Sequence, residues 1–293
     1  MYDIQAIYEA TSVAHAVELL QAHPSAHIIA GGSDVLIKIR EGKLAGCELV
    51  SIQALDELRG VNMDEDGTLR ILPVTSFSHI TKNPLIQQYV PVLGEAVDMV
   101  GGPQVRNIGT IGGNTCNGVT SADSASTLVA FDAIMEITGP GGVRRLPIGE
   151  FYVKAGQVAL QPAELLTAIL IPRESYENTS GHYIKYAMRN AMDIATLGCS
   201  VNVRLSADKK IIERMRIGYG VAGPVPMRAK NAEEAANGKP VSEETIAAAA
   251  KAALTDVSPR TSWRASKELR LQLVEELCKR ALRKAIELNG GAV

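Results

Sequence analysis

The stretch IIAGGSDVLI, from Ile28 to Ile37, breaks a run of buried-strand residues at two consecutive glycines and then resumes as apolar. Glycine lets the backbone take positive φ and leaves the backbone amides unobstructed by a Cβ atom. The stretch is therefore either a plain hairpin turn or a nest of amides that binds an anion. A strand over residues 2–9 and an apolar helical stripe capped by Thr11 or Ser12 precede it, so the chain is predicted to open as β-α-β.

The whole chain has 293 residues, of which 46% are hydrophobic and 21% charged, and this length is enough for two or three cores. A net charge of -2 gives no field that attracts nucleic acid. We expect no secretory signal at the amino terminus and no membrane span. The four cysteines, Cys47, Cys116, Cys199 and Cys278, are far apart, which favours a reducing, cytoplasmic location and argues against a metal site.

Further along the chain, the pattern predicts a helix from about Pro84 to Met99 and a mostly irregular loop from Gly101 to Gly118. A strand follows over residues 164–172, and a polar segment after Pro172 marks a domain boundary. Beyond it we expect strands over residues 183–189, 196–205 and 211–220, and then helices capped by Ser242 and Ser266. The last helix has a buried stripe of Leu271, Val274, Cys278, Ala281, Ala285 and Ile286.

A second glycine pair occurs in TIGGN, Thr110 to Asn114, and it shares the design of the first. Either pair alone is typical of a tight turn, but two nests suit a diphosphate held from both sides, as a dinucleotide cofactor requires. Many hydrogen-bonding side chains follow, although Ser121 or Asp123 could simply cap the next helix. GYGVAG, Gly218 to Gly223, is followed by Pro224 and is interpreted as a strand end, not as a dinucleotide fingerprint.

AGGSD, VGGPQVRNIGT, TIGGN, NGVTSADSA and KYAMRNAMDIATLGC, in this order and spacing, resemble the FAD-binding subunits of bacterial xanthine dehydrogenases, within the molybdenum hydroxylase family. The resemblance covers nearly the whole chain. It implies an α+β fold, in which a vanillyl-alcohol-oxidase-type FAD-binding domain forms residues 1–174 as two α/β lobes, split near residue 55. A smaller C-terminal domain of antiparallel sheet and helices would form residues 175–293.

The resemblance also implies which residues bind the cofactor, while it implies no catalytic residue and no metal ligand in this chain. Val100 stands where animal relatives place an aromatic ring against the isoalloxazine, so the stacking of the flavin stays open. The other implied FAD-binding residues are Ile28, Ile29, Ala30, Gly31, Gly32, Ser33, Asp34, Val35, Thr110, Ile111, Gly112, Gly113, Asn114, Asp123, Leu166 and Lys185.

By resemblance, the chain would carry FAD between partner subunits and an acceptor. A molybdenum-cofactor subunit would oxidise a purine, with xanthine the favoured substrate, an iron–sulfur subunit with [2Fe-2S] clusters would pass electrons on, and FAD would deliver a hydride to NAD. NADP or ferredoxin stays open as acceptor. The assembly would be a heterotrimer repeated as a dimer. Alternatives are a cofactor-free scaffold subunit, a flavin subunit for nicotinate or another azaheterocycle, and a stand-alone flavin enzyme, for which no base is apparent.

Overall fold

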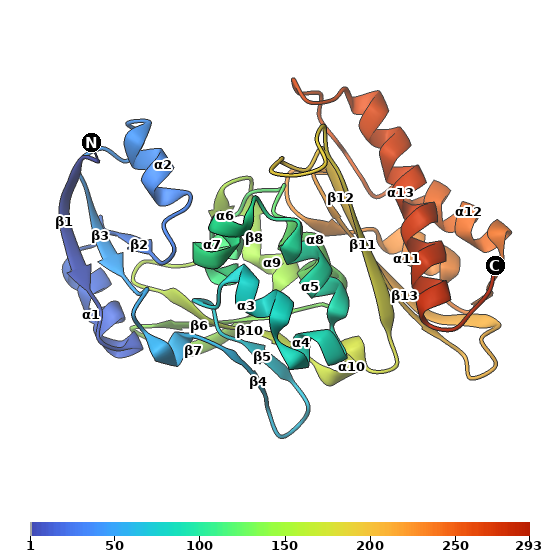
Figure 1. The fold of residues 1–293 in the computed structure, drawn as a ribbon, viewed down its shortest axis with the longest axis horizontal. Helices are drawn as coiled ribbons and strands as arrows, with labels where there is room; N and C mark the ends of the chain where they lie inside the picture. The colour runs from blue at the N-terminus through green and yellow to red at the C-terminus, as the bar shows by residue number, and fades with distance from the viewer. Residues whose placement is uncertain (1) are drawn as a thin grey trace.

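The computed structural model describes residues 2–293. Figure 1 shows three bodies side by side in chain order: a small sheet (blue), a larger central sheet with helices (green), and a third sheet (yellow) with red and orange helices. Each body has its own cluster of buried apolar side chains. The arrangement is the α+β fold that the sequence predicts.

The N-terminal body is a parallel sheet with strand order β1-β3-β2, so the β-α-β opening is confirmed. Ser12, and not Thr11, caps the first helix, because its hydroxyl accepts a hydrogen bond from the His15 amide. The glycine turn after β2 leads into a helix and is therefore not a hairpin turn. The elements are β1 (Ile4–Glu9), α1 (Val13–Ala22), β2 (His27–Ile29), α2 (Val35–Arg40) and β3 (Cys47–Ser51).

The central body is an antiparallel sheet in the order β4-β5-β10-β6-β7, in which β10, a late strand, pairs with β5 and β6. Its elements are η1 (Asp56–Leu58), β4 (Val61–Met63), β5 (Leu69–Ile71), α3 (Phe77–Lys82), α4 (Pro84–Tyr89), α5 (Pro91–Asp98), α6 (Pro103–Ile108), α7 (Ile111–Cys116), α8 (Asp123–Ala130), β6 (Ile134–Gly139), β7 (Gly142–Pro147), α9 (Ile148–Phe151), the hairpin of β8 (Tyr152–Lys154) and β9 (Gln157–Val158), and β10 (Leu165–Ile171).

Two predictions for this body are wrong in detail. The helix expected from Pro84 to Met99 is two helices, α4 and α5, because Pro91 has no amide to donate and begins a new helix at its first position. The loop expected over residues 101–118 contains α6 and α7. Pro103 opens the first and the Thr110 hydroxyl caps the second, and these start signals prevail over the low helix propensity of glycine.

The C-terminal body is an antiparallel sheet in the order β11-β12-β13-β14, covered on one side by three helices. GYGVAG lies at the end of β13, and Ser242 and Ser266 cap α12 and α13, as predicted. The elements are α10 (Arg173–Tyr176), β11 (Ser180–Tyr186), β12 (Leu197–Leu205), β13 (Ile211–Gly220), β14 (Met227–Arg228), α11 (Lys230–Ala236), β15 (Lys239–Pro240), α12 (Glu243–Ala253) and α13 (Lys267–Leu288).

The buried stripe of α13 differs from the prediction at its beginning. Leu271 is only half-buried, and its neighbour Arg270 is buried in its place. The guanidinium of Arg270 donates to the carbonyl oxygens of Thr196 and Arg260 and to the Ser262 hydroxyl. A buried cation is tolerated where, as here, each of its three nitrogens has a hydrogen-bond acceptor. The rest of the predicted stripe is buried.

The central and C-terminal bodies pack through α5 and α8, which lie between the two sheets (Figure 1). Every residue of α8 is buried. A Cβ atom at Gly218 of β13 would lie 2.1 Å from the carbonyl oxygen of Ser126, so glycine is required where helix and sheet approach this closely. The start of α8 thus meets the C-terminal sheet directly.

Candidate functional site

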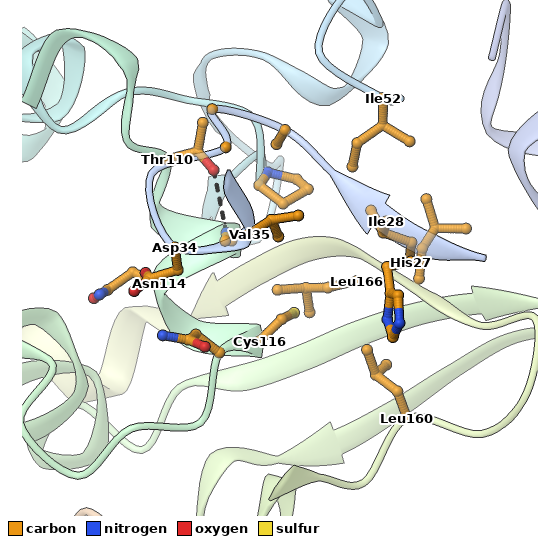
Figure 2. Close-up of a pocket in the computed structure, with 18 of the residues that line it drawn as sticks. His27, Ile28, Asp34, Val35, Ile52, Thr110, Asn114, Cys116, Leu160 and Leu166 are labelled. Carbon is orange, nitrogen blue, oxygen red and sulfur yellow. Dashed lines mark hydrogen bonds between the residues drawn. The ribbon is translucent and has the colours of Figure 1, made fainter. Parts of the chain in front are cut away.

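A cavity of about 500 Å³ lies between the N-terminal and central bodies. Its wall comes from the end of β2 and the glycine turn after it, from α6 and α7, and from the chain that leads into β10. In Figure 2, Asp34 and Asn114 lie at one end of the cavity, and Ile28 and Leu160 lie at the other. A concave site of this volume, lined by both apolar and polar side chains, is typical of an organic cofactor pocket.

The first glycine turn has the properties of an anion nest. Gly32 has a positive φ of 73°, which glycine adopts without strain. Across residues 2–293, no protein acceptor takes a hydrogen bond from the amides of Gly31, Gly32, Ser33 or Asp34. The hydroxyl oxygen of Ser33 is buried and also has no partner among those residues. Because buried polar groups are normally paired, these donors indicate a ligand with acceptor oxygens.

Gly31 has a second role, which is to let the two glycine segments touch. A Cβ atom at this position would lie 1.9 Å from the carbonyl oxygen of Ile108, at the end of α6. Any side chain here would push α6 away from the turn. The sequence therefore needs glycine at Gly31 for packing and at Gly32 for backbone conformation.

The second glycine segment does not share the design that we predicted for it. The amide of Gly112 donates to the Pro73 carbonyl (2.9 Å), and the amides of Gly113 and Asn114 donate to the side chain and carbonyl of Thr110. Figure 2 shows the bond to the Thr110 hydroxyl as a dashed line. These amides are occupied, so α7 offers the cavity mainly its side chains. Gly112 is required because a Cβ atom would lie 2.3 Å from Pro73.

Most of the predicted FAD-binding residues line this one cavity, although they come from distant parts of the sequence. Val100 and Leu166 contribute apolar surface. The lining residues among those predicted are Ile28, Ala30, Gly31, Gly32, Ser33, Asp34, Val35, Val100, Thr110, Gly112, Gly113, Asn114 and Leu166.

Four predicted residues do not line the cavity. Ile29 follows Ile28 on a strand, where successive side chains point to opposite faces. Ile111 is fully buried in the central core. Asp123 and Lys185 pair with each other, at 2.9 Å between carboxylate and ammonium, outside the cavity lining. Position in the sequence motif therefore does not guarantee a place in the wall.

The Asp123 carboxylate is buried, and it also accepts a hydrogen bond from the Tyr183 hydroxyl at 2.7 Å. Burial raises the pKa of Asp123, while Lys185 and Tyr183 act to lower it. Burial and the neighbouring carboxylate raise the pKa of the Tyr183 phenol well above its ordinary value, so the phenol keeps its proton. The cluster is a buried ion pair with its oxygens hydrogen-bonded.

The sequence missed several lining residues. Lys38 lies one helical turn after Asp34 on α2, and its ammonium donates to the Asn117 side chain across the cavity at 2.7 Å. The spacing of four residues after Asp34 is a signal that indicates a shared helix face. Phe77 and Leu160 also line the cavity, and no local pattern marks them, because tertiary contacts alone bring them there.

Cys116 also lines the cavity, and burial raises the pKa of its thiol to about 12, so it stays protonated. All four cysteines are free. In the part of the chain that the structure describes, no group of three His, Cys, Asp or Glu side chains is placed to hold a metal ion. Over the same residues, no helix has both the length and the apolar character needed to cross a membrane.

Comparison with known proteins assigns the two halves of the chain. Residues 2–174 match the family model for the FAD binding domain in molybdopterin dehydrogenase, and residues 182–285 match that for the CO dehydrogenase flavoprotein C-terminal domain. The chain belongs to the family of FAD-binding subunits of molybdenum hydroxylases. This membership confirms the resemblance found in the sequence.

Members of this family are similar to the chain over almost its full length. The putative xanthine dehydrogenase FAD-binding subunit of Escherichia coli (strain K12) is 41% identical over 99% of both chains. The carbon monoxide dehydrogenase medium chain of Hydrogenophaga pseudoflava is 30% identical over 94% of both. A solved structure of carbon monoxide dehydrogenase from that organism has a TM-score of 0.92 at 29% identity, covering 99% of both chains. The predicted fold class is confirmed.

The residues of the cavity fit the family's cofactor. The diphosphate of FAD carries acceptor oxygens, and the unpaired amides of Gly31 to Asp34 and the buried Ser33 hydroxyl are donors without partners. Lys38 adds a cation at the same wall. The other end, where Figure 2 places His27 beside Ile28 and Leu160, has apolar surface that suits a ring system. The donor set and the shape therefore agree with FAD.

Proposed function

We propose that the chain binds FAD in the cavity between its N-terminal and central bodies. The turn from Gly31 to Asp34 would hold the diphosphate through its backbone amides and the Ser33 hydroxyl, with Lys38 nearby. Thr110 and Asn114 would donate from their side chains. Val100 and Leu166 would enclose the flavin ring and keep water from it. The observation that carries the proposal is the set of unpaired donors in the first glycine turn.

We further propose that the chain is the electron-transfer subunit of a xanthine dehydrogenase. Bound FAD would supply the chemistry that links one-electron donors, the [2Fe-2S] clusters of one partner subunit, to a two-electron acceptor, NAD. The chain itself binds, orients and shields the cofactor. The 41% identity to a putative xanthine dehydrogenase subunit favours a purine substrate, which a separate molybdenum-cofactor subunit would oxidise. A nicotinate dehydrogenase FAD-subunit of Eubacterium barkeri, 31% identical over 75% of each chain, supports an azaheterocycle as the second candidate.

We also propose a division of the chain into a FAD-binding domain, residues 1–174, split near residue 55, and a C-terminal domain, residues 175–293. The family matches to residues 2–174 and 182–285 support this division. The partners would be an iron–sulfur subunit and a molybdenum-cofactor subunit, assembled as a heterotrimer that repeats as a dimer. A cytoplasmic location agrees with the four free cysteines.

The first test is the visible absorption spectrum of the purified chain, before and after anaerobic addition of NADH. We expect flavin absorption that NADH bleaches, because electron transfer between flavin and nicotinamide runs in both directions. Flavin absorption that only dithionite bleaches would overturn NAD as acceptor and leave FAD binding intact. A colourless chain that takes up no added FAD would overturn the whole proposal and support the scaffold alternative.

The substrate and partners need the complex from its native host. We expect a tag on this chain to recover two further subunits, and the complex to reduce NAD with xanthine. Reduction with nicotinate but not with xanthine or hypoxanthine would support the second candidate. Recovery of the chain alone would contradict the proposed assembly.

A further inference from the structure

One hydrogen bond crosses the cavity from the N-terminal body to the central body. The ammonium of Lys38, on α2, donates to the side-chain oxygen of Asn117 at 2.7 Å. Both residues line the cavity, and both are half-buried. A charged donor makes a stronger hydrogen bond than a neutral one, so this contact resists separation of the two walls.

The backbone holds both ends of this bond in place. The Lys38 amide donates to the Asp34 carbonyl oxygen at 3.0 Å, so α2 is continuous with the glycine turn that precedes it. Asn117 ends α7, where its amide donates to the Gly113 carbonyl oxygen at 3.0 Å. The bond between the two side chains therefore ties the Gly31–Asp34 turn to the opposite wall.

The N-terminal body has few other polar contacts with the rest of the chain. Across residues 2–293, no second hydrogen bond or ion pair joins residues 2–52 to the chain beyond residue 60. Two further contacts stay within the connection between the bodies, from the Val13 amide to the Glu57 carboxylate and from the Arg59 guanidinium to the Gln53 carbonyl oxygen. The bond from Lys38 is thus the polar link across the cavity itself.

Apolar packing supplies the remaining contact between the two bodies. Val74 and Leu165 of the central body pack into the N-terminal cluster of buried side chains, beside Ile52. Gly31 lies against the end of α6, as described above. Apolar contacts of this kind have no preferred direction, whereas a hydrogen bond fixes two atoms at one distance. The N-terminal body is therefore held by an apolar base and by one directed bond.

We propose that Lys38 and Asn117 are positioning residues that form a clasp across the FAD cavity and set the rate at which the cofactor enters and leaves. The proposal rests on the proposed binding of FAD in this cavity. A cofactor held by both walls exchanges when the walls move apart, and this movement breaks the clasp. The protein makes the bond by itself and keeps it around FAD. Its loss therefore favours neither the free nor the bound protein, and it changes rates more than affinity.

The test measures the kinetics of FAD binding in variants that lack one partner or both. Lys38→Met and Asn117→Ala each remove the bond at a half-buried position, where the fold tolerates substitution. We expect the association and release rates both to rise about tenfold in each variant, while the Kd stays within about threefold of wild type. The double variant should be no faster than either single variant, because all three lack the same bond. Stopped-flow flavin fluorescence measures both rates.

Two further variants make the comparison specific. Lys38→Arg keeps a charged donor and should restore most of the wild-type rates. Lys43→Met is the matched control, because this lysine follows α2, is exposed, pairs with Glu41 and lies outside the cavity lining. It should change neither rate.

Three results would overturn the clasp. A raised Kd with an unchanged association rate would mean that Lys38 binds the cofactor directly. Effects that multiply in the double variant would mean that the two residues act separately. Unchanged rates in both single variants would mean that the bond does not limit exchange.

Unfolding by urea without FAD tests the bond independently of the cofactor. The equilibrium constant for unfolding should rise about fivefold in each single variant and no further in the double variant. A further rise in the double variant would show that the two side chains are not coupled, against the clasp. Failure of the wild type to bind FAD would contradict the proposed function, and the unfolding measurements would still decide whether the bond joins the two bodies.

Discussion

At the scale of single residues, Ser33 gives the sharpest test of the cavity. Its hydroxyl is buried without a partner among the described residues, so Ser33→Ala removes an unsatisfied group from the FAD-free protein. We expect the free energy of unfolding without FAD to stay the same or to rise slightly, since an unpaired buried hydroxyl is costly. The Kd for FAD should rise about tenfold, equal to roughly 1.4 kcal/mol, if the hydroxyl donates to a phosphate oxygen. Fluorescence titration and chemical denaturation measure the two quantities.

The opposite result would be equally clear. A Kd that stays within about twofold of wild type, together with raised stability, would mean that Ser33 is buried for packing alone. Ser258→Ala is the matched control, because the Ser258 side chain is exposed in the chain between α12 and α13 and lies outside the cavity lining.

Glu164 gives a prediction about pH. Its carboxylate accepts two hydrogen bonds from Arg144, at 2.7 Å, one from Nε and one from Nη2, and this contact holds its pKa below the usual 4.5. In the unfolded chain the carboxyl binds a proton at a higher pH than in the folded protein. The stabilisation is therefore complete above about pH 4.5 and is lost as pH falls through the lowered pKa.

The measurement is unfolding by urea between pH 3 and pH 6, without FAD because Glu164 also borders the cavity. Wild type should lose more stability over the acid half of this range than Glu164→Gln does. If the free energy of unfolding changed equally with pH in the two proteins, Arg144 would not favour the ionised form of Glu164. Glu150→Gln, at an exposed position, serves as the control.

At the scale of elements, Arg270 determines how α13 begins. Its guanidinium is buried and satisfies two carbonyl oxygens and a hydroxyl in the chain before the helix and at the start of β12. Arg270→Met keeps the volume but removes every donor. We expect a loss of about 2–3 kcal/mol in the free energy of unfolding, because buried acceptors are left unpaired.

Denaturation with urea measures this loss, and Arg280→Met is the matched control on the same helix. Arg280 is exposed and pairs with Glu276 across one turn, so its removal should cost less than about 0.5 kcal/mol. A similar loss of unfolding free energy in the two variants would show that the buried guanidinium of Arg270 adds nothing to the stability of the protein.

The sequence predicts the elements well where signals are local. The caps at Ser242 and Ser266 and the strand end at GYGVAG follow from residue types within a few positions. It fails in the segment of residues 101–118, where glycines suggest a loop but Pro103 and Thr110 begin short helices. It also fails on Arg270, because the groups that satisfy this guanidinium lie elsewhere in the sequence.

The same distinction applies to the cavity. The residues of the turn at Gly31 to Asp34 left open a tight turn or an anion nest, and its unpaired amides in the structure favour the nest. The sequence did not indicate that the amides of α7 are occupied, since Pro73 and Thr110 accept their hydrogen bonds only in the folded chain. Lys38 could be inferred from helical spacing, but Leu160 could not.

At the scale of the whole molecule, FAD should stabilise the chain by mass action. A ligand that binds only the folded state adds about 2.7 kcal/mol at a concentration of 100 times its Kd. Calorimetry with increasing FAD should show a Tm that rises with concentration. Because α5 and α8 pack between the central and C-terminal sheets, unfolding of the C-terminal sheet should shift together with that of the cavity. Riboflavin, which has no phosphate for the Gly31 turn, should produce a much smaller shift at equal concentration.

Two separate thermal transitions, of which FAD raises the Tm of only one, would show that the C-terminal body unfolds independently of the bodies that form the cavity. That result would be consistent with FAD in the cavity but not with coupling across the interface.

The central position of β10 also has a consequence for synthesis of the chain. Its neighbour β5 is complete at Ile71, but β10 begins only at Leu165 and brings a wall of the cavity with it. At ordinary translation speeds, the ribosome needs roughly 5 to 20 seconds to make the intervening chain. During this time the edge of β5 that will receive β10 is exposed to other nascent chains. Cofactor loading is therefore a late event, and the cell must protect the first half of the molecule until the second half arrives.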